Sequence, residues 1–115
     1  MTNLDRGKVR NEFAAAVNMD LRELRAWLDT EESRRVGWTG KNRSAKESVG
    51  HASGRRIVGL LGKAEGELTD GDYEHMRKVV GFVRRHLAQR PENVFTSRWR
   101  YSLMNWGRDP TKDPL

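Results

Sequence analysis

Cysteine is absent from the 115-residue sequence, which excludes disulfide bonds, thiolate metal sites and a cysteine nucleophile. This absence is typical of a reducing cytoplasm. No apolar run is longer than a few residues, so no segment is predicted to span a bilayer. The first six residues also lack the apolar centre of a signal peptide. We therefore expect a cytoplasmic protein that has no membrane partner.

The alternation typical of β-strands is missing as well, whereas helical spacing recurs along most of the chain. The sequence therefore predicts one all-α domain of about five helices over residues 1–115, with frayed ends at 1–6 and 109–115. The expected helices cover 8–17, 21–29, 45–61, 70–89 and 97–106, and a further turn or two follows Thr30. The expected N-caps are Asp20, Thr30, Ser44, Thr69 and either Thr96 or Ser97. Gly37 and Gly107 are expected to end helices.

Small residues weaken the expected helix that ends at Leu61. Gly50, Ser53, Gly54 and Gly59 lie within it, and each glycine costs about 1 kcal/mol relative to alanine. Two explanations are open. Either another element packs closely against this side of the helix, or the helix is kinked.

Acidic residues are scarce in two long stretches. Residues 34–63 contain eight Lys or Arg and one acid, and residues 76–108 contain the same numbers, so each stretch has a net charge of +7. Residues 64–74 between them contain five acids and no base. Positive charge that is separated in this way indicates a polyanionic partner such as nucleic acid. A solvated basic surface without a dedicated partner is the alternative.

The expected helix at 70–89 has two different faces. Its apolar side is formed by Tyr73, Met76, Val80, Val83 and Leu87, which fall within an arc of about 80°. The opposite half contains Arg77, Lys78, Gly81, Arg84 and Arg85, with Gly81 at its centre. A glycine there would let a phosphate chain lie close to the helix. In the alternative interpretation Gly81 faces another helix and the four cations are only solvated.

The basic stretch at 34–63 offers Lys41, Arg43, Arg55 and Arg56 as candidate phosphate contacts. Trp38 lies in the same loop as the first two and could stack on a base or fold back into the core. In the last helix the spacing of Trp99, Leu103 and Trp106 is typical of core residues.

No catalytic or metal-binding pattern is evident. The three histidines are His51, His75 and His86. Glu47 and His51 lie one turn apart, but no further ligand follows at metal-binding spacing. We therefore expect structural or capping roles for the histidines, and we predict neither catalytic residues, metal nor cofactor.

Four segments are similar to a known family. They are ESVGHASGRRIV at 47–58, DYEHMRKVVG at 72–81, HLAQRP at 86–91 and RWRYSLMNWG at 98–107. Over about residues 10–108 the chain resembles a family of small bacterial and fungal proteins of unknown function, some of whose members are labelled DNA-binding. That family has Thr-Pro near the position of Asp20 and Leu21, and both pairs can begin a helix. The resemblance implies nucleic-acid binding and identifies no functional residue.

We therefore expect a nucleic-acid-binding protein that contacts the phosphates of double-stranded DNA, rather than RNA, with little sequence specificity. If about five cations neutralise phosphates, log K should fall with log salt at a slope of about −4.5. The first alternative is a protein-interaction or stress-associated module in which the face of Gly50 and Gly54 packs on a partner or forms a homodimer. A peripheral membrane protein ranks lower, because the core needs the apolar face of the 70–89 helix. An enzyme is not expected.

Overall fold

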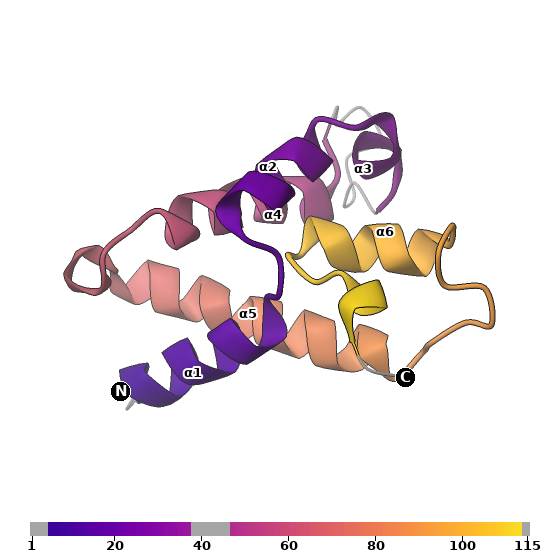
Figure 1. The fold of residues 1–115 in the computed structure, drawn as a ribbon. Helices are drawn as coiled ribbons and strands as arrows, with labels where there is room; N and C mark the ends of the chain where they lie inside the picture. Colours follow the sequence, from indigo (N-terminus) through magenta and orange to yellow (C-terminus); the bar gives the residue numbers. More distant parts are fainter. Residues whose placement is uncertain (1–4, 38–46, 114–115) are drawn as a thin grey trace.

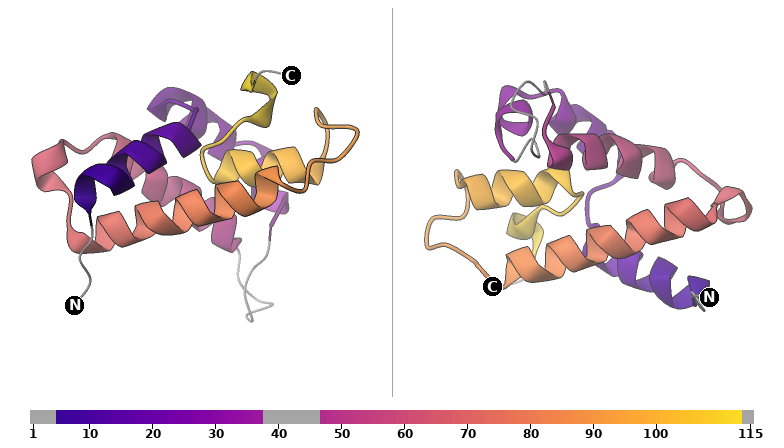
Figure 2. Two further views of the ribbon diagram at one scale, coloured as in Figure 1. Left: turned by 90° about the horizontal axis from the view of Figure 1, so that it is seen from below. Right: turned by 180° about the vertical axis from the view of Figure 1, so that it is seen from behind.

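A single long helix, α5, crosses the molecule and carries other helices on both sides (Figures 1 and 2). The computed structural model describes residues 5–37 and 47–113. Within these ranges all regular structure is helical, so the all-α prediction is confirmed. The α-helices are α1 (Arg6–Ala16), α2 (Leu21–Leu28), α3 (Glu31–Arg35), α4 (Val49–Leu61), α5 (Asp70–Leu87) and α6 (Arg98–Asn105). Two 3₁₀ turns, η1 (Glu65–Glu67) and η2 (Pro110–Lys112), complete the chain.

Local capping explains where most helices begin. Asp20 accepts a hydrogen bond from the Glu23 N–H while the Glu23 carboxylate accepts one from the Asp20 N–H, which forms the predicted capping box. Thr69 and Asp72 form a second capping box at α5, and Ser97 caps α6. Gly37 and Gly107 have φ angles of 105° and 85°, which L side chains rarely adopt.

Helix α4 begins later than the sequence predicted. Glu47 and Ser48 are not helical, and the Ser48 hydroxyl accepts the His51 N–H at 3.0 Å. The cap is therefore Ser48 rather than Ser44, because the Ser48 oxygen satisfies an N–H that has no partner within the helix.

The small residues of α4 allow other elements to approach closely. A Cβ on Gly54 would lie 2.6 Å from both the Asn105 carbonyl oxygen and Leu28 Cδ2. A Cβ on Gly50 would lie 3.0 Å from Trp106 Nε1. Of the two explanations offered by the sequence, close packing is the one observed. The surface suggested for a partner or a second copy is therefore filled from within the same chain.

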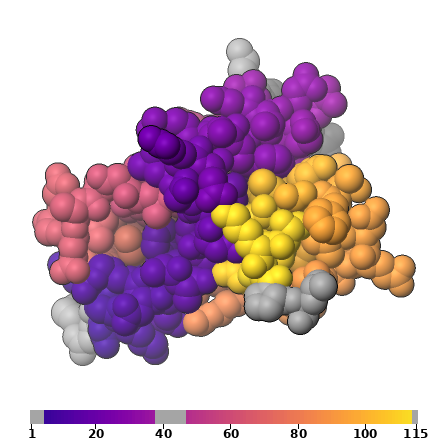
Figure 3. Space-filling model, in the orientation of Figure 1, coloured from indigo at the N-terminus to yellow at the C-terminus, as the bar shows by residue number. Residues whose placement is uncertain are grey.

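The C-terminal segment is ordered by contacts with the link between α1 and α2, and Figure 3 shows it against the N-terminal helices. The Asn18 amide donates to the Asp109 carbonyl at 2.9 Å and accepts the Asp109 N–H at 2.7 Å. Arg100 donates to the Asp109 carboxylate, and Pro110 is buried. Residues 109–113 thus differ from the frayed end expected from sequence, because side chains distant in sequence satisfy their polar groups.

The core lies between α5 and the surrounding helices. Val9 and Phe13 of α1, Leu24 and Leu28 of α2, and Leu103 of α6 are buried in it. Trp106 is 5% exposed and Trp99 packs against the core, so the core role predicted for the aromatic residues of the last helix is confirmed. No helix within the described ranges is long and apolar enough to cross a membrane.

Candidate nucleic-acid interface

The apolar half of α5 is buried, which leaves its basic half in contact with solvent. Tyr73, Met76, Val80 and Val83 are all buried, whereas the cations on the other side are exposed. Helix α1 packs against one flank of α5, and α4 and α6 lie on the other side (Figure 2). The exposed face of α5 contains Glu74 near its start and the basic residues after it. We call its basic part the α5 ridge and define it by Arg77, Lys78, Gly81, Arg84 and Arg85.

The cations of the α5 ridge differ in their ion pairing. Arg84 donates to the Glu12 carboxylate of α1 at 2.7 Å. Arg77, Lys78 and Arg85 form no ion pair with any residue that the structure describes. These three cations can therefore meet an anion without first losing a carboxylate partner.

Gly81 lies open at the centre of the ridge. A Cβ built on Gly81 would meet only the Arg85 side chain within 4 Å, at 3.1 Å from Nη1. A hollow of about 230 Å³ adjoins it, and its lining residues are Val9, Glu12, Arg77, Val80, Gly81 and Arg84. No described helix packs closely against Gly81, although Val9 and Glu12 of α1 lie across the hollow, and whether the four cations are only solvated stays untested. The geometry leaves room for a chain of phosphates beside Gly81.

Arg55 and Arg56 are sequence neighbours, but the structure directs them to different places. Arg56 Nη2 lies 3.6 Å from Asp72 Oδ1 at the start of α5. Lys63 also donates to Asp72, at 2.7 Å, and this bond together with the Thr69 N–H lowers the pKa of Asp72 to about 2. Arg56 is thus close to the N-terminal end of α5, with its charge partly neutralised by Asp72.

His75 lies on α5 beside Arg56 and Lys78. Its Nε2 atom is 2.9 Å from the hydroxyl oxygen of the buried Ser53 of α4. Burial, followed by the positive charges of Arg56 and Lys78, lowers the pKa of His75 to about 4. The imidazole is therefore neutral near pH 7 and adds no charge to the ridge.

Arg55 belongs to a separate group on the other side of α4. It donates to the Glu47 carboxylate through Nε, at 2.7 Å, and through Nη2. The Arg55 guanidinium lowers the pKa of Glu47 to about 2, with a further contribution from His51. The structure therefore does not bring Arg55 onto the α5 ridge. Lys41, Arg43 and Trp38 lie outside the described residues.

The remaining histidines have structural contacts. His51 Nε2 lies 2.8 Å from the Leu28 carbonyl oxygen, and Nδ1 contacts Glu47. His86 stacks on Phe82 with ring centroids 3.8 Å apart, and Phe82 in turn stacks on Trp106. The described parts of the chain contain no group of three or more His, Cys, Asp or Glu side chains that could hold a metal ion.

The structure also reveals positive charges that were not singled out from the sequence. Arg25 of α2 and Arg34 near the end of α3 line a hollow together with Arg55. Arg25 lies among residues 1–33, which have more acids than bases, and Arg34 is only the first cation of the basic stretch at 34–63, so the sequence did not connect the two with Arg55. Only the packing of α2 against α4 brings the three arginines together.

The fold and the ridge define a small all-helical domain with a basic helix face. Residues 12–104 match the model of DUF3140, a family described as proteins of unknown function, and the chain belongs to this family. No curated protein matches the chain. No solved structure matches it either.

Proposed function

We propose that this protein binds double-stranded DNA through backbone phosphates, with low sequence specificity. The observation that supports the proposal is the α5 ridge, where Arg77, Lys78 and Arg85 have no ion-pair partner among the described residues and surround the open Gly81. Phosphate contacts supply most of the affinity of non-specific DNA binding. The proposal includes no catalytic step and places the protein in the cytoplasm.

Contact with phosphates, rather than with base edges, follows from the position of α5. A helix that reads bases enters the major groove and must protrude from its domain. Helix α5 is instead flanked by α1 on one side and by α4 and α6 on the other, and six of its eighteen residues are buried. The accessible ridge can lie along a phosphate backbone, where Arg and Lys side chains position the duplex without reading its sequence.

The first alternative, a protein-interaction module, was based on the face of α4 that contains Gly50 and Gly54. Gly50 and Gly54 pack against Trp106, Asn105 and Leu28 of the same chain. At Gly54 a partner or a second copy would have to displace Leu28 and the backbone of Asn105. This packing is less favourable to association through the α4 face, whereas the α5 ridge stays accessible to nucleic acid.

Fluorescence anisotropy with a labelled duplex, measured from low to physiological salt, tests the proposal. Three unpaired cations predict a slope of log K against log salt of about −2.7, and recruitment of Arg84 and Arg56 would bring it to about −4.5. Double charge reversal at Arg77 and Arg85 should weaken binding to all duplex sequences alike. The matched control reverses the exposed Arg22 and Arg98, which changes net charge equally and lies outside the ridge.

Three outcomes would contradict the proposal. The first is no duplex binding even at low salt. The second is an equal loss of affinity in the ridge variant and in the control variant, since net charge alone would then explain binding. The third is much tighter binding to duplex RNA or to single strands, because duplex DNA would then be the wrong partner.

A further inference from the structure

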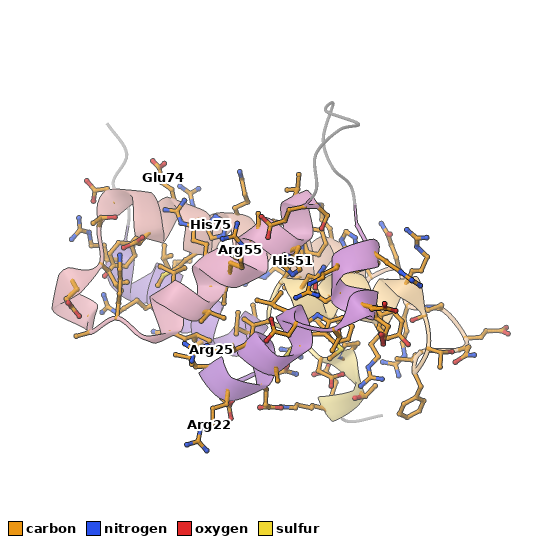
Figure 4. The ribbon with its side chains drawn as sticks, turned by 90° about the horizontal axis from the view of Figure 1, so that it is seen from above. Arg22, Arg25, His51, Arg55, Glu74 and His75 are labelled. Carbon is orange, nitrogen blue, oxygen red and sulfur yellow. The ribbon has the colours of Figure 1, made fainter. Side chains whose placement is uncertain are left out.

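We propose that the hollow between α2, α3 and α4 is a binding site for a small phosphate monoester. Its volume is about 370 Å³, which falls within the range of small-molecule sites. The lining residues are Arg25, Leu28, Asp29, Arg34, His51, Arg55 and Val58. Figure 4 labels Arg25 on α2, and His51 and Arg55 on α4. This inference does not depend on DNA binding, because none of these residues belongs to the α5 ridge.

The hollow has an excess of guanidinium groups. Three arginines from three different helices face one hollow, whereas the nearby carboxylates are Asp29 in its lining and Glu47 behind Arg55. Arg34 Nη2 is 3.6 Å from Asp29 Oδ1, which is too far for a good hydrogen bond. Arg25 forms no ion pair with a described residue. Positive charge therefore remains for a ligand after both carboxylates are counted.

Arg55 is held in place without using all its donors. Glu47 accepts from Nε and Nη2 of Arg55, while no described residue accepts from Nη1. A guanidinium has five N–H donors in a planar fork, so its outer edge can still bind an oxyanion. Glu47 thus orients Arg55 toward the hollow and reduces the entropy that a ligand would have to remove.

His51 also lines the hollow. Its two ring nitrogens contact the Glu47 carboxylate and the Leu28 carbonyl oxygen. These two contacts fix the position of the ring next to Arg55.

The apolar lining limits what kind of anion fits. Leu28 and Val58 provide an apolar wall beside the arginines. A free inorganic anion would leave this wall exposed, whereas a phosphate monoester with a ring or short aliphatic group would cover it. Phosphate matches three converging guanidiniums better than carboxylate does, because it offers three oxygens to bidentate donors.

Nitrogen-15 NMR on the full chain tests this assignment, with phenyl phosphate as the probe. We expect saturable shifts at Arg25, Arg55 and Val58, with weaker binding of inorganic phosphate and no binding of phenol. Arg25→Gln should weaken the binding of phenyl phosphate by at least about tenfold, which is the effect of losing one charged hydrogen bond. Arg22→Gln is the matched control, since Arg22 is exposed on the same helix and does not line the hollow.

Several results would overturn the assignment. They are shifts that do not saturate, equal affinity in the Arg25→Gln and wild-type proteins, and phenol binding as tight as that of phenyl phosphate. Displacement of phenyl phosphate by duplex DNA would show that the hollow is part of a DNA surface and would also overturn it. Charge reversal at Arg77 and Arg85 should leave phenyl phosphate affinity unchanged, so the two proposals can fail independently.

Discussion

The indole N–H of Trp27 donates to the Oδ1 atom of Asn105 at 2.7 Å, which joins α2 to α6 across 78 residues of sequence. Asn105 is 1% exposed. The same Oδ1 atom accepts the Ser33 hydroxyl, and Asn105 Nδ2 donates to the Ser33 carbonyl oxygen at 3.0 Å. One buried amide therefore satisfies polar groups from α2 and α3 and connects both helices to α6.

Replacement of Asn105 by alanine should lower the free energy of unfolding by about 2–4 kcal/mol, because buried polar groups of Trp27 and Ser33 would lose their partner. Urea denaturation measures the change. Asn93→Ala is the control, since the Asn93 side chain is exposed. A loss at Asn105 no larger than that at Asn93 would show that water replaces the amide.

Two glycines of α4 give opposite predictions for the same substitution. A Cβ on Gly54 would lie 2.6 Å from a backbone oxygen and from Leu28, whereas a Cβ on Gly59 would meet nothing within 4 Å. We expect Gly54→Ala to destabilise the fold by about 1–3 kcal/mol. Gly59→Ala should stabilise it by up to about 1 kcal/mol, because alanine favours the helix. Thermal unfolding of both variants checks the pair, and a change of the same sign in both would contradict this account of packing.

Features determined by neighbouring residues could be predicted from the sequence. The capping boxes at Asp20 and Thr69 depend on residues three positions apart. The positive φ angles of Gly37 and Gly107 follow from the need to end a helix. The apolar and basic sides of α5 follow from helical periodicity alone.

Features determined by distant residues could not be predicted in this way. The sequence does not say that Asn18 binds the backbone of Asp109. It also does not show that Arg55 turns to Glu47 while Arg56 turns to Asp72. Helical spacing places these two side chains 100° apart, but the surrounding elements decide which one lies near α5. The basic stretch at 34–63 is consequently divided between two surfaces.

His75 should make stability depend on pH between about 4 and 6.5. Its pKa is lowered from 6.5 to about 4 in the folded protein, chiefly by burial and then by the charges of Arg56 and Lys78, against the opposing effect of Asp72. Between these values the unfolded chain binds a proton that the folded chain does not bind. Stability is therefore lost as the pH falls through this window.

His75→Gln should flatten the stability profile between pH 5 and 6.5, as followed by urea denaturation at each pH. The carboxylates of Glu47 and Asp72, whose pKa values are lowered to about 2, lose their contribution only in more acidic solution. An unchanged slope in the variant, or NMR titration of the His75 ring near pH 6.5, would contradict the prediction.

Gly81→Ala separates a structural role of this glycine from a role in DNA binding. The new methyl group would meet only the far end of the flexible Arg85 side chain, so the helix should gain up to about 1 kcal/mol in stability. If a phosphate chain passes close to Gly81, the same variant should bind duplex DNA more weakly although it is more stable. Gly59→Ala is the control for DNA affinity, since Gly59 is open and lies on α4. Thermal unfolding measures the change in stability, and fluorescence anisotropy on the same samples measures the change in affinity for duplex DNA. Unchanged DNA affinity in Gly81→Ala would show that phosphates contact the cations of the ridge without approaching its centre.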